Sequence, residues 1–186
     1  MSSPALSSRP LARKLAVGAF VAASTFVAFA QQVTKEPVTG VVNFARLETT
    51  VACGGATKPE AVPELKKMGF VSIINLREAT ETGANIEAEE AATKAAGMKF
   101  FHVPFNGNSP DTRAVDRFLD AITLPGSEPA FIHCAGGNRA AAMWLAKRVA
   151  VDHWPADRAV AEAAALGLSS PTLRQFILDY SLAHTR

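Results

Sequence analysis

Apolar residues recur along the chain at two different spacings, and the two patterns alternate. Short runs of β-branched and aromatic residues occupy 71–77, 99–105 and 130–134, and such runs are typical of buried strands. Stretches such as 85–96 and 155–166 instead carry strong helix formers without a breaker inside them. Strands that alternate with helices predict an α/β domain with a mainly parallel central sheet flanked by helices on both faces.

Weaker patterns precede these elements. Residues 41–48 alternate loosely between apolar and polar positions and predict a first strand, and 49–52 predict a second. Thr57 is placed to cap a helix with Pro59 in its first turn, and Gly69 is placed to end it.

The first thirty residues have the pattern of a signal peptide. Arg9, Arg13 and Lys14 precede an uncharged, mostly apolar stretch at 15–30, which ends in the small-residue pattern Ala-Phe-Ala at 28–30. We expect cleavage after this pattern and a bacterial periplasmic or secreted protein. The alternative is an uncleaved inner-membrane anchor, and the signal segment would then be the chain's contact with the membrane.

Charge and composition narrow the classes of function. Removing the three basic residues of the signal segment from the 19 in the chain leaves 16, against 17 acidic residues, so we expect no nucleic-acid partner. Two cysteines and four scattered histidines match no metal-ligand spacing, and we expect no metal. The predicted organisation is a signal peptide at 1–30, an N-terminal extension at 31–40 and one domain at 41–186.

The candidate chemistry lies where the strand at 130–134 turns into a helix. Cys134 ends the strand, Gly136 and Gly137 allow a tight turn, and helix formers follow Arg139. A helix N-terminus favours a cysteine thiolate and binds anions through its N–H groups, and an arginine adds a planar pair of donors. We therefore expect Cys134 to attack a phosphate ester. The predicted phosphate-binding residues are Ala135, Gly136, Gly137, Asn138 and Arg139.

Cys134 and Arg139, with four residues between them, resemble the signature loop of cysteine-dependent protein phosphatases in a shortened form. Gly-Gly-Ala-Thr at 54–57, Gly-Phe at 69–70 and Ile-Asn-Leu-Arg at 74–77 follow the order seen in an atypical bacterial branch of dual-specificity-like phosphatases. That branch includes the phosphatase-like domain found beside beta-lactamase-hydrolase-like proteins. The resemblance implies a dual-specificity-phosphatase-like fold.

The resemblance also implies a reaction. A hydrolase of this kind cleaves phosphate monoesters through a cysteinyl-phosphate intermediate and needs no cofactor. Its partner would be a phosphorylated protein, carrying phosphotyrosine or phosphoserine, or a small phosphate ester. The residue before the cysteine is commonly a histidine that holds the loop, and His133 matches that position.

Related phosphatases carry a general acid on a loop before the cysteine, and Asp111 is the best match for it. The alternative is a capping role, with Ser109 as the N-cap, Pro110 in the first turn and Asp111 opposing the helix dipole. Arg77 similarly admits two interpretations. It could contact substrate, or it could form a surface ion pair with an acidic residue of the loop that follows, Glu78 or Glu81.

Two other functions remain open. The four-residue spacing also resembles the persulfide loop of single-domain rhodaneses, which predicts a sulfurtransferase. Ala140 stands where the typical phosphatase loop has a serine or threonine that helps the thiolate to leave, and this favours a catalytically inactive phosphate- or partner-binding module. Cys53 follows a predicted strand, so a reversible disulfide with Cys134 is a further hypothesis, against which Cys53 is simply a buried small residue.

Overall fold

The computed structural model of the chain describes residues 1, 32–48 and 50–184. The predicted signal peptide therefore lies, except for Met1, outside the described residues. Residues 31–186 form one compact unit. Among the described helices, none has the length and apolar character that crossing a membrane requires.

A six-stranded sheet forms the centre of this unit, with the strand order β1-β2-β3-β6-β4-β5. Strands β3, β6, β4 and β5 pair in parallel, and β1 and β2 add an antiparallel edge. The predicted mainly parallel sheet is thus confirmed. The strands are β1 (Val33–Lys35), β2 (Ala45–Leu47), β3 (Val51–Gly54), β4 (Ser72–Asn75), β5 (Lys99–His102) and β6 (Ala130–His133).

The sheet starts earlier in the chain than the sequence predicted. Residues 31–40 were expected to form an extension outside the domain, but β1 lies within them and pairs with β2. The strand predicted at 41–48 is reduced to 45–47, because Asn43 adopts a left-handed φ of 51° that ends extended backbone there. These short edge strands have too few alternating positions to be recognised by pattern.

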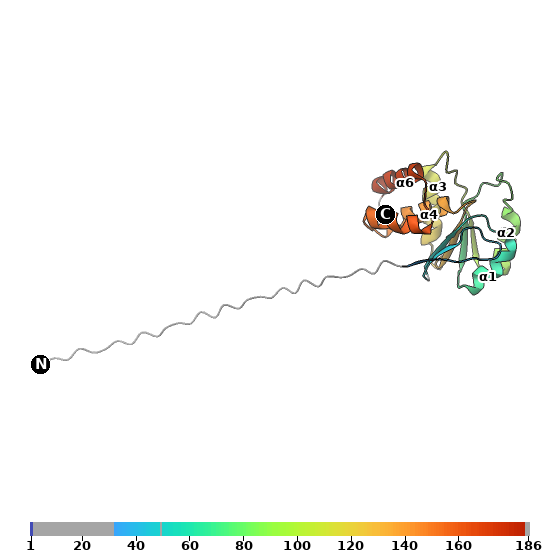
Figure 1. Cartoon of the computed structure of the whole chain (residues 1–186), viewed down its shortest axis with the longest axis horizontal. Helices are drawn as coiled ribbons and strands as arrows, with labels where there is room; N and C mark the ends of the chain where they lie inside the picture. Colours follow the sequence, from blue (N-terminus) through green and yellow to red (C-terminus); the bar gives the residue numbers. More distant parts are fainter. Residues whose placement is uncertain (2–31, 49, 185–186) are drawn as a thin grey trace. The chain divides into compact units, whose positions relative to one another are not determined.

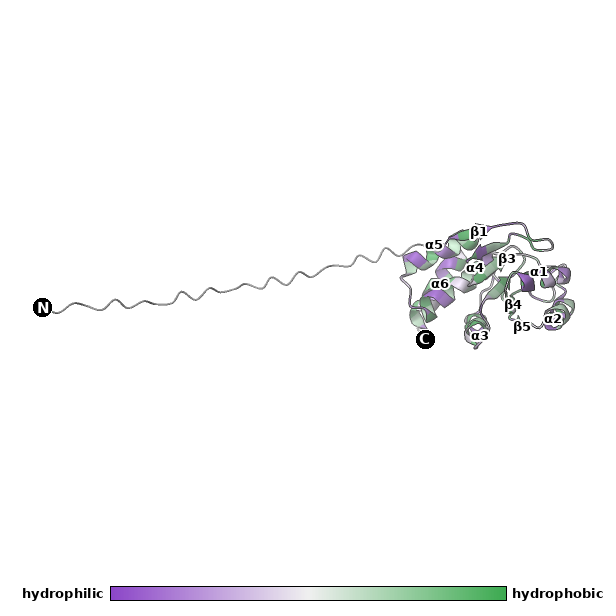
Figure 2. Ribbon diagram, turned by 90° about the horizontal axis from the view of Figure 1, so that it is seen from below, coloured by the Kyte–Doolittle hydropathy of each residue, from purple (hydrophilic) through white to green (hydrophobic). Residues whose placement is uncertain are grey.

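Helices cover both faces of the sheet. Figure 1 shows α1 and α2 on one side and α3, α4 and α6 on the other. Figure 2 shows α4 between the strands and the pair α5 and α6. The helices are α1 (Val62–Lys67), preceded by the 3-10 turn η1 (Pro59–Ala61), α2 (Ile86–Ala95), α3 (Thr112–Thr123), α4 (Asn138–Ala146), continued by the π-helical turn η2 (Lys147–Val151), α5 (Ala156–Leu166) and α6 (Pro171–Ala183).

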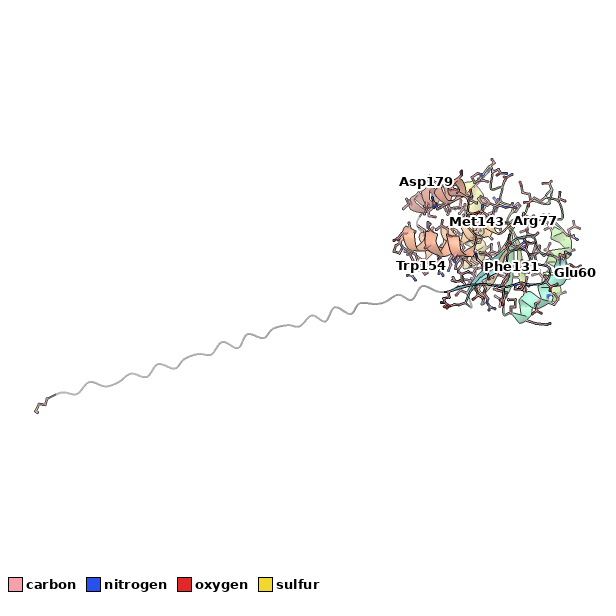
Figure 3. The ribbon with its side chains drawn as sticks, viewed as in Figure 1. Glu60, Arg77, Phe131, Met143, Trp154 and Asp179 are labelled. Carbon is pink, nitrogen blue, oxygen red and sulfur yellow. The ribbon has the colours of Figure 1, made fainter. Side chains whose placement is uncertain are left out.

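Helix α4 is buried over most of its length. Every residue from 140 to 146 is inaccessible to solvent, and α4 contacts α3, α5, α6 and β6. In Figure 3, Met143 lies within this helical layer, whereas Phe131 of β6 lies among the strands. The many alanines let neighbouring helices approach α4 closely. The helix that follows the candidate loop is therefore a fixed support for it.

Candidate active site

The segment from β6 to α4 forms a tight turn around the sulfur of Cys134. Gly137 is the N-cap of α4 and has a φ of 100°, which favours glycine. Gly55 lies against the same turn, where an added Cβ would stand only 2.7 Å from the Ala135 carbonyl oxygen. The neighbouring Ala56 N–H donates to that carbonyl at 2.8 Å. The Gly-Gly pair noted in the sequence thus allows the β3 end to support the Cys134 loop.

Cys134 is buried at the N-terminus of α4. Its sulfur accepts a hydrogen bond from the Gly137 N–H at 3.1 Å. Its own N–H donates to the Gly54 carbonyl at 3.1 Å. A backbone donor and a helix N-terminus directed at sulfur stabilise a thiolate more than a thiol. The predicted nucleophile therefore has the surroundings that such a role requires.

Arg139 is held beside the loop by Glu81 through two parallel hydrogen bonds. Its Nη1 donates to Oε1 at 2.7 Å and its Nη2 to Oε2 at 2.8 Å. Nη1 also donates to the Phe105 carbonyl at 2.8 Å. A guanidinium has five N–H groups in one plane, and the contacts to Glu81 and Phe105 use those of Nη1 and one of Nη2. Burial opposes the charge of Arg139, but the bonds to Glu81 and the charge of Cys134 outweigh it and raise the pKa of Arg139.

Glu81 stays ionised because of these contacts. The hydrogen bond from Arg139 is the main cause that lowers the pKa of Glu81 to about 2, assisted by bonds from the Glu78 N–H and from Arg77. The sequence suggested Glu81 only as a surface partner for Arg77. The structure instead assigns it the orientation of Arg139, across 58 residues of chain. The only sequence signal for this role is its position after a strand of a parallel sheet, where ligand sites gather.

Arg77 supports the loop that carries Glu81. The predicted ion pair exists, with Nε 3.3 Å from a Glu81 oxygen, but Arg77 is buried rather than on the surface. Its guanidinium also donates to the carbonyls of Thr82 and Gly83 at 2.7 and 2.9 Å. It therefore closes the loop after β4, and it does not line the pocket described next.

Cys134 and Arg139 open onto one pocket of about 400 Å³. Asn106 organises one wall of it, because its amide nitrogen donates to Glu78 at 3.1 Å and its amide oxygen accepts the N–H groups of Asn108 and Ser109. Gly136 and Asn138 of the predicted phosphate-binding loop also line it. The full lining is Glu78, Glu81, Asn106, Gly107, Asn108, Cys134, Gly136, Asn138, Arg139, Ser170 and Leu173.

Asp111 occupies the N-cap of α3 rather than this pocket. Its Oδ1 accepts the Arg113 N–H at 3.0 Å, and its side chain is partly exposed. The helix starts at Thr112, so the predicted placement of Ser109 as N-cap and Pro110 in the first turn is wrong. Both residues belong to the loop before the helix, where Ser109 donates to Asn106.

His133 and Cys53 are buried residues of β6 and β3, next to the strand ends from which the site is built. His133 is buried, with Nε2 2.8 Å from an oxygen of Glu89 on α2, which fits the expected loop-supporting role. Cys53 is buried on β3, and burial is the main cause that raises the pKa of its thiol well above the usual value. Both cysteines are free thiols, and a disulfide between Cys53 and Cys134 stays a prediction.

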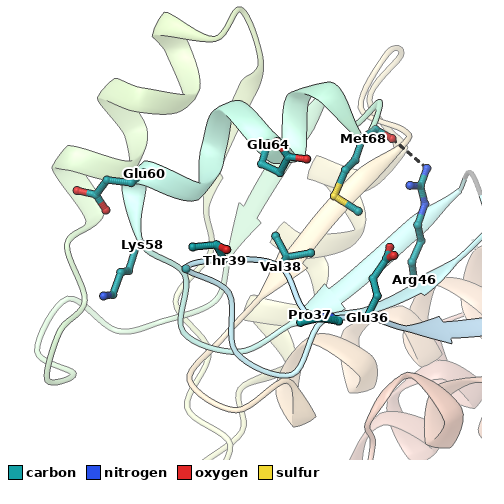
Figure 4. Close-up of a pocket in the computed structure, with 10 residues that line it drawn as sticks. Glu36, Pro37, Val38, Thr39, Arg46, Lys58, Glu60, Glu64 and Met68 are labelled. Carbon is teal, nitrogen blue, oxygen red and sulfur yellow. Dashed lines mark hydrogen bonds between the residues drawn. The ribbon is translucent and has the colours of Figure 1, made fainter.

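A wider pocket of about 990 Å³ lies elsewhere on the unit, beside β2 and α1 (Figure 4). Its lining contains Arg46, which donates to the Met68 carbonyl at 2.9 Å, and mixed charges such as Lys58 and Glu60, but no residue of the Cys134 loop. Among the described residues there is no group of three or more histidine, cysteine or carboxylate side chains that could hold a metal ion. Cys134 and Arg139, the side chains with candidate chemistry, thus line the smaller pocket and not the wider one.

Residues 43–151 match the protein family described as "Beta-lactamase hydrolase-like protein, phosphatase-like domain". The chain belongs to this family. The matched range of this phosphatase-like domain extends from the residue before Phe44 to the end of η2, and it contains the loops after β4, β5 and β6 that line the pocket. The family suggested by the Cys134 loop is therefore confirmed.

Individual relatives agree with the family and the fold. A beta-lactamase hydrolase-like protein of Agrobacterium fabrum is 31% identical over 102 residues, which cover 54% of this chain but only 23% of that protein. A DUF442 protein of Shewanella putrefaciens has a similar structure, with a TM-score of 0.67, 18% identity and coverage of 80% of this chain and 97% of that one.

The core catalytic domain of the PP-IP phosphatase SIW14 from S. cerevisiae also has this fold. It superposes with a TM-score of 0.60 and 18% identity, over 79% of this chain and 88% of that one. The phosphatase-like domain described here therefore has the α/β fold of dual-specificity-type phosphatases, as predicted.

Proposed function

We propose that the chain is a cysteine-dependent phosphatase that hydrolyses phosphate monoesters. The observation that carries the proposal is the pocket in which the Cys134 sulfur, the N-terminus of α4 and the Arg139 guanidinium lie together. The three non-bridging oxygens of a phosphate accept hydrogen bonds, and backbone N–H groups and a guanidinium are suitable donors for them. The family supports the same reaction class.

The proposed reaction has two displacements at phosphorus. The Cys134 thiolate forms an S–P bond while the P–O bond to the leaving group breaks, and a general acid protonates the leaving oxygen. Water then attacks the cysteinyl phosphate, breaks the S–P bond and releases inorganic phosphate, while the carboxylate of the acid takes the proton of the water. We propose Asp111 for this acid, on the basis of its place at the end of the loop 106–111, which also carries the Asn106 wall of the pocket.

The pocket lining favours a small, polar substrate within this class. Arg139 is the basic side chain of the lining, two carboxylates stand beside it, and asparagine and serine side chains form most of the remainder. Leu173 is its large apolar residue, and none of the described residues that line the pocket is aromatic. A substrate with one phosphate on a hydroxyl-rich alcohol fits this lining better than phosphotyrosine does. The ring of phosphotyrosine is bound best by apolar or aromatic side chains. A phosphoserine protein is the alternative substrate.

We further propose that the protein acts in the periplasm or outside the cell, on the basis of the signal pattern at residues 1–30. Fractionation of cells that express the full chain, followed by N-terminal sequencing, tests this. A mature protein that begins at Gln31 in the periplasmic fraction is the expected result. An intact chain in the cytoplasm would contradict it.

A second candidate function is a binding module without turnover. Ala140, which follows Arg139, is completely buried and offers no hydroxyl to assist the departing thiolate. The spacing shared with rhodaneses adds a sulfurtransferase as the third candidate. One set of assays separates the three: turnover of p-nitrophenyl phosphate, sulfur transfer from thiosulfate to cyanide, and binding of orthovanadate. We expect turnover of the phosphate ester with inhibition by vanadate. Vanadate binding without turnover would contradict the phosphatase, and thiocyanate production would identify the sulfurtransferase.

A further inference from the structure

A buried carboxylate lies near the candidate site on helix α2, which covers the face of the sheet opposite to α4. Glu89 of α2 is 2% exposed. One of its oxygens, Oε1, lies 2.8 Å from Nε2 of His133, and the other, Oε2, accepts a hydrogen bond from the Asn75 amide at 2.7 Å. Both partners are as deeply buried as Glu89 itself. Each oxygen of this carboxylate thus contacts a different residue of the sheet.

The two partners of Glu89 occupy matching positions on adjacent strands. Asn75 ends β4, His133 ends β6, and the two residues are paired in the parallel register. Immediately after these residues the chain leaves the sheet and forms two of the loops that line the pocket. Glu89 therefore connects the last points at which the two strands are still held by the sheet.

The two loops that start at these strand ends must be held at a fixed spacing. The loop after β4 carries Glu81, and the loop after β6 carries Cys134 and Arg139. They are joined by the two hydrogen bonds of 2.7 and 2.8 Å between Arg139 and Glu81. A change in the separation of the strand ends would move Arg139 relative to the Cys134 sulfur.

Further contacts fix both partners of the carboxylate. The oxygen of Asn75 accepts the Arg77 N–H at 2.8 Å, which shapes the first turn of the loop after β4. The His133 ring stacks on Phe131, with centroids 5.5 Å apart and an angle of 5° between the planes. The His133 carbonyl accepts the Leu76 N–H at 2.9 Å. Asn75 and His133 therefore transmit the position of Glu89 directly to the backbone of both loops.

An apolar side chain would be the ordinary occupant of this site. Burying a carboxylate is costly unless its oxygens are paired, and α2 offers alanines at neighbouring positions. We propose that Glu89 is a positioning residue, which sets the spacing between the Glu81 loop and the Cys134 loop. Its effect on catalysis rests on the proposed phosphatase function, but its effect on Cys134 itself does not.

Two replacements of similar size test this role. Glu89→Gln keeps two polar atoms, with its oxygen toward Asn75 and its amide toward His133, whereas Glu89→Met fills the same volume without any bridge. Alkylation of Cys134 by iodoacetamide at neutral pH reports the thiolate and its N–H contacts without any need for turnover. We expect Glu89→Met to slow alkylation and to lower kcat/KM for p-nitrophenyl phosphate by about 100-fold, the cost of a misplaced reacting group. Glu89→Gln should recover most of both.

Glu90→Ala is the matched control. Glu90 is adjacent on α2, is partly exposed and pairs with Lys94 at 2.6 Å, so this variant should match wild type in both assays. Thermal unfolding of each variant shows that it is folded. Equal alkylation rates in Glu89→Met and Glu89→Gln would overturn the proposal.

Asn75→Leu removes the other end of the bridge and provides a second test if Glu89→Met does not fold. The same loss is expected in it, and a wild-type alkylation rate would overturn the proposal. A wild-type protein that turns over no phosphate ester, but whose Cys134 alkylation depends on Glu89 as described, would contradict the proposed function alone.

Discussion

Two of the loops that line the pocket have different roles. The loop from β6 to α4 supplies the sulfur of Cys134, the N–H groups of the turn and Arg139, which are the groups that would contact a phosphate. The loop after β4 supplies Glu81 and Arg77, whose charged groups bind to Arg139, to each other and to backbone carbonyls. The loop from β6 to α4 carries the groups that would contact a phosphate, and the loop after β4 keeps Arg139 in position.

This difference has a counterpart in the sequence. The reactive groups lie within six consecutive residues, 134–139, and form a recognisable motif. The contact that orients Arg139 spans 58 residues and depends on two strands that are neighbours only in the folded sheet. A substitution in the first loop should therefore remove chemistry, whereas one in the second should weaken geometry.

Cys134→Ser tests the reactive loop most severely. The serine hydroxyl does not ionise near neutral pH, so turnover of p-nitrophenyl phosphate should be abolished. The melting temperature should change little, because serine is nearly the same size as cysteine. Activity at the wild-type level would remove Cys134 from the mechanism.

Arg139→Lys should have the next largest effect. A lysine keeps the charge but cannot bind Glu81 and phosphate through two separate edges, and losing such oxyanion donors costs about 10²–10³ in kcat. Steady-state kinetics with p-nitrophenyl phosphate measure the loss. Kinetics equal to those of the wild type would contradict the arrangement described for Arg139.

Glu81→Gln should act on the second loop through geometry and through stability. The lowered pKa of Glu81 means that its stabilising effect is complete above the ordinary carboxyl value of about 4.3 and disappears as the pH falls toward about 2. The wild type should thus exceed the variant by about 1 kcal/mol in unfolding free energy at pH 7. The gap should close progressively below about pH 4.3.

Urea unfolding of both proteins between pH 7 and pH 3 measures this gap. Glu64→Gln is the control, because Glu64 is an exposed acid paired with Lys67 at 3.3 Å. It should show almost no gap at any pH. A gap for Glu81→Gln that does not change with pH would contradict the ionic role of Glu81.

Asp111→Asn lies outside both loops and should have the smallest effect on the turnover of p-nitrophenyl phosphate. Asparagine is as good an N-cap as aspartate, so the fold should persist. If Asp111 protonates the leaving group, hydrolysis of alkyl phosphates should fall more than that of p-nitrophenyl phosphate, whose leaving group needs little protonation. Equal losses on both substrates would leave only the capping role seen at the start of α3.

The sequence was sufficient for the fold class and for the turn between β6 and α4 that carries Cys134 and Arg139. The alternation of strand and helix patterns and the Cys134-to-Arg139 spacing are local signals, and each survives in a single sequence. The Ser170 cap of α6 is local in the same sense, since its hydroxyl accepts the Leu173 N–H at 3.2 Å. Local chemistry determined all of these features.

The features that the sequence did not predict depend on contacts between distant segments. β1 has only three residues, and its strand character comes from pairing with β2. Glu81 and Glu89 look like ordinary acids of a polar loop and an alanine-rich helix, and their partners are identified only by the strand order β6-β4 in the sheet. Nothing in a local pattern distinguishes them from Glu78 or Glu90.

The most direct test of the central claim is to trap the reaction intermediate. Wild-type protein is mixed with a phosphate monoester, quenched in acid within the first turnover, digested and analysed by mass spectrometry. We predict a phosphate adduct on the peptide that contains Cys134, and none in Cys134→Ser. Phosphate release without any adduct on that peptide, or an adduct on another residue, would contradict the account.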